Sequence, residues 1–219
     1  MKKIRLFLYI VRTVTSDYQP KIKDPNYGMS GPNLVDDLLT LATCNRPLRK
    51  GIKNRIKNKE IYVVGISPSI TNPRRALYLM KVDEAITFQK AWERGETNES
   101  YMFKRGGYSP LNSDPSRAHM NGDIIVRSRD GLKYEHVGGV HHNDWWFKVM
   151  EGKEVDSNGD VYLVGDSKIS KWYGEDGPRF TEVLFQKYWK GYPGGMIGHR
   201  IIKDDSASEL LDKLFNLTL

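Results

Sequence analysis

The architecture of this chain follows from Ile61-Tyr-Val-Val-Gly-Ile66 and Ala76-Leu-Tyr-Leu-Met-Lys-Val82, which are separated by Ser67-Pro-Ser-Ile-Thr-Asn-Pro-Arg-Arg75. Both outer segments are runs of β-branched, aromatic and aliphatic residues, with the length of buried strands. The segment between them is rich in Pro, Ser and Asn, which form turns and interrupt strands. We therefore predict two core strands, at residues 61–66 and 76–82, joined by a turn.

Residues 5–12 form a similar apolar run and predict a first strand. The basic residues before this run give the start of the chain the look of a signal peptide. Arg5 interrupts the run, Arg12 ends it, and no small-residue cleavage site follows, so we interpret it as a core strand. No segment approaches the roughly 20 apolar residues of a membrane span, so we expect a cytoplasmic protein with no membrane partner.

Several shorter elements are predicted around these strands. The apolar spacing indicates a helix over residues 34–42, with Asn33 as its cap and Pro47 ending or redirecting the chain after it. Further helices are expected at residues 87–94, 180–188 and 207–215, the last capped by Ser206, and further strands at residues 123–127 and 160–164. Short strands with interposed helices indicate one α+β domain, residues 1–219, on a curved or barrel-like mixed sheet with flanking helices. Residues 180–219 are expected to form a C-terminal helical extension of that domain.

Composition bounds the class of protein. Hydrophobic residues make up 39% of the chain and aromatic residues 11%, which is enough for a packed core. The formal net charge of +7 favours polyanionic partners such as nucleotides or nucleic acid. The single cysteine cannot form a disulfide within the chain.

That cysteine, Cys44, is a candidate nucleophile. It lies in Leu41-Ala-Thr-Cys-Asn-Arg-Pro-Leu-Arg49, where nearby basic side chains would lower the pKa of the thiol. A lone cysteine is more often a small buried hydrophobe, and a thiol can also line a pocket without reacting. The cations that follow fit either phosphate contact or a solvated helix face: Arg46, Arg49, Lys50, Lys53, Arg55, Lys57 and Lys59. Arg49 ends the segment that contains Cys44, and we favour it as a ligand contact.

Two further segments combine polar and aromatic groups. In Gly138-Gly-Val-His-His-Asn-Asp-Trp-Trp146, His141, His142 and Trp145 could bind a base by hydrogen bonds and stacking. Adjacent residues of a strand point to opposite faces, so we predict no metal there. After the strand at residues 160–164, Asp166, Ser167 and Lys168 stand where a rigid scaffold often places functional groups. No P-loop, Rossmann fingerprint or paired-cysteine zinc motif occurs, and no cofactor is predicted.

The ordered set of these segments resembles the second class of nucleotide modification associated domains, a family of phages and bacteria. The matching segments are Tyr9-Ile-Val-Arg12, Thr40-Leu-Ala-Thr-Cys44, Val63-Val-Gly65, Leu77-Tyr-Leu-Met-Lys-Val-Asp-Glu84, Gly122-Asp-Ile-Ile125 and residues 164–178. The chain departs from the family at Cys44-Asn-Arg-Pro47, where Cys-Lys-Pro is usual, and at Lys59-Glu60, where Gly-Asp is usual.

The resemblance implies a role with modified nucleotides in DNA, in the host cytoplasm if a phage encodes the protein. The order of elements also looks like PUA-like domains, small barrels that include readers of modified bases. Carried over from those readers, the pocket would be lined by Thr43, Cys44, Arg49, Ser67, His141, Trp145 and Asp166. Likeness of fold does not establish function.

Three functions remain open on these grounds. The first is a module that binds a nucleotide or a modified base, with aromatic stacking worth ~1–3 kcal/mol per base. The second is an enzyme acting on a base or nucleotide, with Cys44 as nucleophile and His141 or Asp166 as acid or base. The third is a phage protein that sequesters a host nucleotide signal or binds a host protein.

Overall fold

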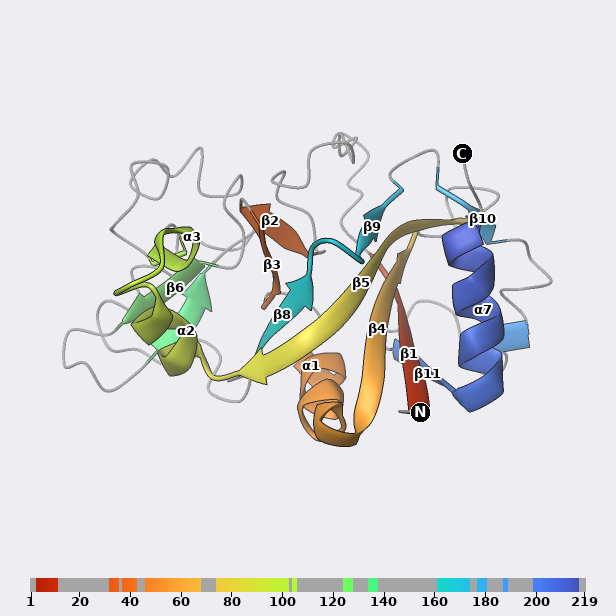
Figure 1. Ribbon diagram of the computed structural model, residues 1–219, viewed down its shortest axis with the longest axis horizontal. Helices are drawn as coiled ribbons and strands as arrows, with labels where there is room; N and C mark the ends of the chain where they lie inside the picture. Colours follow the sequence, from red (N-terminus) through yellow and green to blue (C-terminus); the bar gives the residue numbers. More distant parts are fainter. Residues whose placement is uncertain are drawn as a thin grey trace.

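The computed structural model describes residues 3–11, 32–35, 37–42, 46–67, 74–102, 104–105, 124–127, 134–137, 161–173, 177–180, 187–188 and 199–216. These residues form a mixed α+β structure in which a long sheet is covered by helices (Figure 1). This confirms the predicted fold class at the level of α+β.

The elements fall at the following positions. The strands are β1 (Lys3–Ile10), β2 (Asn33–Val35), β3 (Leu38–Leu41), β4 (Lys59–Ile66), β5 (Arg74–Ile86), β6 (Ile124–Arg127), β7 (Tyr134–Val137), β8 (Tyr162–Asp166), β9 (Lys171–Trp172), β10 (Arg179–Phe180) and β11 (His199–Lys203). The helices are α1 (Arg46–Lys53), α2 (Phe88–Arg94), α3 (Glu99–Met102) and α7 (Asp204–Asn216), with a 3-10 helix η1 (Ile56–Asn58) between α1 and β4.

The main sheet has the order β11-β1-β4-β5-β8-β3-β2, and its two outer strands do not pair with each other within the described residues. Strands β1 and β4 run parallel, and the other strand pairs of this sheet are antiparallel within the described residues. Strand β5 is the long curved ribbon at the centre of Figure 1. One side of β5 pairs with β4, and the other side pairs in turn with β10, β9 and β8.

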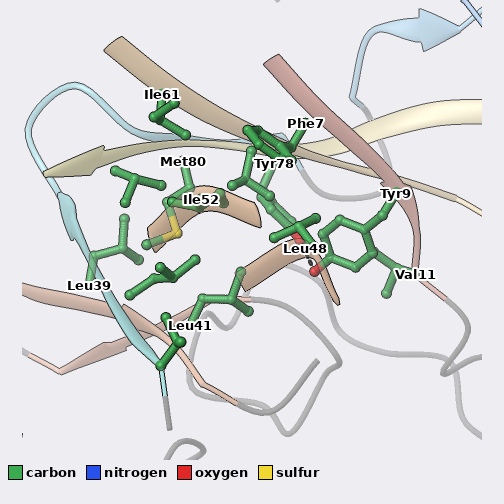
Figure 2. Close-up of a cluster of buried hydrophobic side chains, with 14 of the residues drawn as sticks. Phe7, Tyr9, Val11, Leu39, Leu41, Leu48, Ile52, Ile61, Tyr78 and Met80 are labelled. Atoms are coloured by element: carbon green, nitrogen blue, oxygen red, sulfur yellow. Dashed lines mark hydrogen bonds between the residues drawn. The ribbon is translucent and has the colours of Figure 1, made fainter. Parts of the chain in front are cut away.

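Both faces of the central strands are buried, because successive side chains of a strand point to opposite sides. In β1, Leu6 and Leu8 pack in a cluster with Leu210 and Leu214 of α7. Phe7 and Tyr9 instead join a second cluster with Leu48 and Ile52 of α1, as do Ile61 and Val63 of β4 (Figure 2). We call these two sides of the sheet the α7 side and the α1 side.

A third cluster extends the core to the far end of the molecule from α7 in Figure 1. There α2 and α3 pack beside the two-stranded sheet formed by β6 and β7. The hydroxyl of Thr87 accepts a hydrogen bond from the backbone N–H of Lys90 and so caps α2. This confirms the helix predicted at residues 87–94.

The helix predicted over residues 34–42 is wrong, because this segment forms the antiparallel pair β2–β3. All of β3 is buried: Leu39 and Leu41 lie in the α1-side cluster, whereas Leu38 belongs to the third cluster. A strand buried on both faces carries a continuous apolar run, which can imitate the spacing of an amphipathic helix.

Three further boundaries differ from expectation. Pro47 is the second residue of α1, so it opens a helix rather than ending one, in keeping with the fixed φ of proline in a first helical turn. Phe180 belongs to strand β10, which pairs with β5, so a helix does not begin there. The tail helix begins at Asp204, so Ser206 lies inside its first turn and is not its cap.

The strands predicted at residues 5–12, 61–66 and 76–82 are confirmed as β1, β4 and β5, with shifted ends. Those predicted at residues 123–127 and 160–164 correspond to β6 and β8. The C-terminal segment, residues 180–219, contains α7, and it also contributes β11 to the edge of the main sheet.

Candidate functional site

Five of the predicted site residues lie outside the described residues. They are Thr43, Cys44, His141, His142 and Trp145. Their roles therefore remain predictions from the sequence.

Arg49 is fully buried on α1, with 1% of its surface exposed. Its Nη1 donates a hydrogen bond of 2.5 Å to the carbonyl oxygen of Val161, directly before β8. A hydrogen bond from a charged donor to a buried carbonyl ties α1 to the start of β8. In this arrangement Arg49 supports the core, and contact with a ligand stays a prediction.

Ser67 closes the connection between β4 and β5. Its backbone N–H donates to the carbonyl oxygen of Arg75 at 2.9 Å, and its Oγ accepts from the N–H of Arg75 at 2.8 Å. Only 4% of Ser67 is exposed. The serine thus clamps the base of the loop that joins the two strands.

Asp166, Ser167 and Lys168 form the turn that leaves β8. The Oδ1 of Asp166 accepts hydrogen bonds from the N–H groups of Lys168 and Ile169, at 2.9 and 3.3 Å. Its Oδ2 lies 3.6 Å from the Nζ of Lys81 on β5. These contacts are those of an aspartate that shapes a turn through its own backbone.

The described members of the predicted site lie at separate places along β5. Ser67 bonds to Arg75, near the start of that strand. Asp166 contacts Lys81 in the middle. Val161, which holds Arg49, precedes Tyr162, the partner of the last β5 residue, Ile86. Strand β5 therefore separates Ser67, Asp166 and Arg49 rather than bringing them to one point.

A different set of charged residues shares one side of the sheet, the α1 side. The exposed cations of the α1–η1 segment are Lys50, Lys53, Arg55 and Lys57. Lys59 follows at the start of β4 and lies directly opposite Lys3 of β1. On the next strand along, Lys203 of β11 lies directly opposite Arg5 of β1.

These strand residues share a side with α1 because of the alternation along each strand. Lys3 and Arg5 precede Phe7, Lys59 precedes Ile61, and Phe7 and Ile61 both pack in the α1-side cluster. Lys203 follows Ile201, which packs against the same cluster. We call this set the basic face: Lys3, Arg5, Lys50, Lys53, Arg55, Lys57, Lys59 and Lys203.

Like charges placed directly opposite each other in a sheet repel and destabilise it. One carboxylate relieves part of this repulsion: Oδ1 of Asp204 lies 2.6 Å from Nη1 of Arg5. The hydrogen bond from Arg5 lowers the pKa of the Asp204 carboxyl, and Lys3 and Lys59 lower it further. Glu60 points away from the basic face and accepts a hydrogen bond of 2.6 Å from the hydroxyl of Tyr62. The basic face is thus arranged to attract anions.

Sequence reasoning found the basic run from Arg46 to Lys59 but missed the contributions of β1 and β11. The available signals were the basic residues within two short apolar segments, Lys3-Ile-Arg5 and His199-Arg-Ile-Ile-Lys203. Neither signal reveals that the two strands are neighbours, because their pairing joins opposite ends of the chain.

Comparison of the chain with protein-family models, with curated proteins and with solved structures gave no significant match. In the part of the chain that the structure describes, no helix has the length and apolar character needed to cross a membrane.

Proposed function

We propose that the protein binds nucleic acid through the basic face, as a module that recognises a nucleotide or a modified base. The observation that carries the proposal is that cations from residues 3–5, 50–59 and 203 lie on one side of the sheet. Clustered lysines and arginines contact phosphates and release their counterions, which is the main source of affinity for nucleic acid.

The position of the Cys44 turn supports the same proposal. Cys44 precedes Arg46, where α1 begins, so in the chain it adjoins the helix that supplies much of the basic face. In the proposed module, Thr43 and Cys44 read the edge of the base, His141 and Trp145 stack on it, and the basic face holds the phosphates. A PUA-like arrangement of the sheet would bring the Cys44 turn and the segment with His141 and Trp145 together. We include that arrangement in the proposal.

The test compares two variants that lose the same charge. The first carries Lys50→Gln, Lys53→Gln and Lys57→Gln on the basic face. The second carries Lys90→Gln on α2 together with Lys187→Gln and Lys213→Gln, whose side chains contact Glu209 of α7 on the other side of the sheet. Binding of single-stranded and duplex DNA is followed by fluorescence anisotropy over a series of salt concentrations.

We expect the basic-face variant to bind more weakly and with a shallower dependence on salt. Each lysine that contacts a phosphate adds roughly 0.7 to 0.9 to the slope of log K against log salt. The control variant should keep nearly the wild-type slope, because its charges lie away from the basic face. Equal losses in the two variants, or no DNA binding by the wild type, would overturn the proposal.

A further inference from the structure

Gly51 of α1 faces side chains from the turn after α1, from β1 and from β11. A Cβ built on this glycine would lie 3.5 Å from Cε1 of Phe7, 3.6 Å from Nη1 of Arg55 and 3.9 Å from Nε2 of His199. Nη1 of Arg55 and Nε2 of His199 therefore both lie within 4 Å of the same point. Both flank the same half-buried position beside the basic face.

Arg55 and His199 are held in place by different elements. Arg55 lies in the turn after α1, and its Nη1 donates a hydrogen bond of 2.8 Å to the carbonyl oxygen of Gly51. His199 is the first residue of β11, and its ring lies 5.6 Å from the ring of Phe7 on β1. A guanidinium has five N–H donors, and an imidazolium donates through both nitrogens, so the pair matches the oxygens of a phosphate.

We propose that Arg55 and His199 form a phosphodiester subsite over Gly51, at which phosphate and a proton bind to the protein together. The inference rests on the proposed function and adds to it a site and a pH dependence. The ligand chemistry is a phosphate diester with a single negative charge, as in the backbone of DNA or RNA.

The coupling to a proton follows from the surroundings of His199. Burial lowers the pKa of the imidazole, and the positive charge of Arg55 lowers it further. The other charged groups on the same side are the remaining members of the basic face and Asp204, whose carboxylate is engaged by Arg5. The free protein therefore holds His199 neutral at neutral pH. A bound phosphate favours the imidazolium, so binding raises the pKa of His199, and lower pH strengthens binding by linkage.

The experiment measures affinity for a DNA oligonucleotide without terminal phosphates at about pH 6 and about pH 8, on either side of the ordinary histidine pKa. Such an oligonucleotide has no phosphate group that titrates in this range. Wild type should bind more tightly at the lower pH, by at most about tenfold for each unit by which binding raises the histidine pKa. His199→Gln should lose this gain. His136→Gln, on β7 at the other end of the molecule, should keep it.

A second variant tests the geometry rather than the proton. Gly51→Ala places a methyl group between Arg55 and His199 at ordinary van der Waals distances, so α1 should fold at least as stably as before. We expect weaker DNA binding together with an unchanged or higher melting temperature. Affinity that is unchanged in Gly51→Ala, or a pH dependence that survives in His199→Gln, would overturn the subsite. Loss of binding in the basic-face lysine variant alongside either result would leave the proposed function standing.

Discussion

The ring of Tyr78 on β5 lies directly over the α-carbon of Gly65 on β4. A Cβ at Gly65 would stand 2.6 Å from Cζ of Tyr78 and 2.9 Å from its hydroxyl oxygen. The tyrosine cannot move aside easily, because it is buried and its hydroxyl bonds to that of Tyr9 on β1. The absence of a side chain at Gly65 of β4 therefore allows Tyr9 of β1 and Tyr78 of β5 to meet across that strand.

Gly65→Ala should destabilise the protein by about 1–3 kcal/mol, the usual cost of adding volume to a well-packed core. The measurement is the free energy of unfolding in urea. Gly51→Ala is the matched control, since the same substitution on α1 meets atoms no closer than 3.5 Å. The two variants should shift stability in opposite directions, and equal effects would contradict this account of Gly65.

Arg49→Met should destabilise the protein by about 1–3 kcal/mol, because the buried carbonyl of Val161 loses its charged donor. Lys50→Met, at the exposed neighbouring position, should change stability by less than about 0.5 kcal/mol. Both can be measured by chemical unfolding. An Arg49→Met protein that is as stable as wild type would show that the arginine is not required by the core.

The ion pair between Glu84 and Arg94 should make the stability of the fold depend on pH in the acidic range. Two nitrogens of Arg94 donate to the two carboxylate oxygens of Glu84, at 3.0 and 2.7 Å. These hydrogen bonds lower the pKa of Glu84 below its usual value. The ionised pair therefore stabilises the fold above the unfolded-state pKa of about 4.3, and this contribution is lost as the pH falls through the lower folded-state pKa.

At about pH 7 we expect Glu84→Gln to cost less than about 1 kcal/mol, since the pair is partly exposed and screened. A double-mutant cycle with Arg94→Gln, measured from about pH 7 to about pH 3, isolates the coupling between the two side chains. The coupling should shrink toward zero at the acidic end. A coupling that is independent of pH would exclude the ionic contribution.

Tyr173 should have the opposite dependence, at alkaline pH. Its hydroxyl donates a hydrogen bond of 2.7 Å to the carbonyl oxygen of Leu214 near the end of α7. Burial raises its pKa to about 12. The raised pKa means that its contribution to stability is complete below the unfolded-state pKa of about 10 and is lost as the pH rises toward the folded-state value.

Tyr173→Phe should cost about 0.5–1.5 kcal/mol at neutral pH, because a helix-terminal carbonyl loses its donor. The difference in unfolding free energy between wild type and variant should diminish between about pH 10 and about pH 12. Unfolding curves recorded at several alkaline pH values provide the test. A constant difference over that range would show that the hydroxyl does not titrate as its burial requires.

Residues 34–42 form strands although their apolar spacing is typical of a helix. Leu34, Leu38 and Leu39 match the spacing of an amphipathic helix, but the segment is a strand pair. Local spacing could not distinguish the two, because β3 is covered on one side by α1 and on the other by residues of α2. Only the presence of both covering layers makes a continuous apolar strand favourable.

The candidate site shows the same limit. The resemblance to PUA-like readers implied that Arg49, Ser67 and Asp166 line one pocket, and β5 holds them apart. Charge density, in contrast, correctly drew attention to the α1–η1 segment. The chain order could not show that Lys3, Arg5 and Lys203 would join that segment, since pairing between strands is a non-local event.

Composition and local pattern were sufficient to specify the central strands, the helix after Thr87 and the excess of positive charge, because hydrophobic periodicity, capping and ionisation are properties of neighbouring residues. Packing in three dimensions determined which side of the sheet each residue faces and what it contacts. It buried Arg49, placed Tyr78 over Gly65, and set His199 of the last strand beside Arg55 near the first helix. Those relationships depend on strand register and on which face each helix covers, and neither quantity is encoded in any short stretch of the chain.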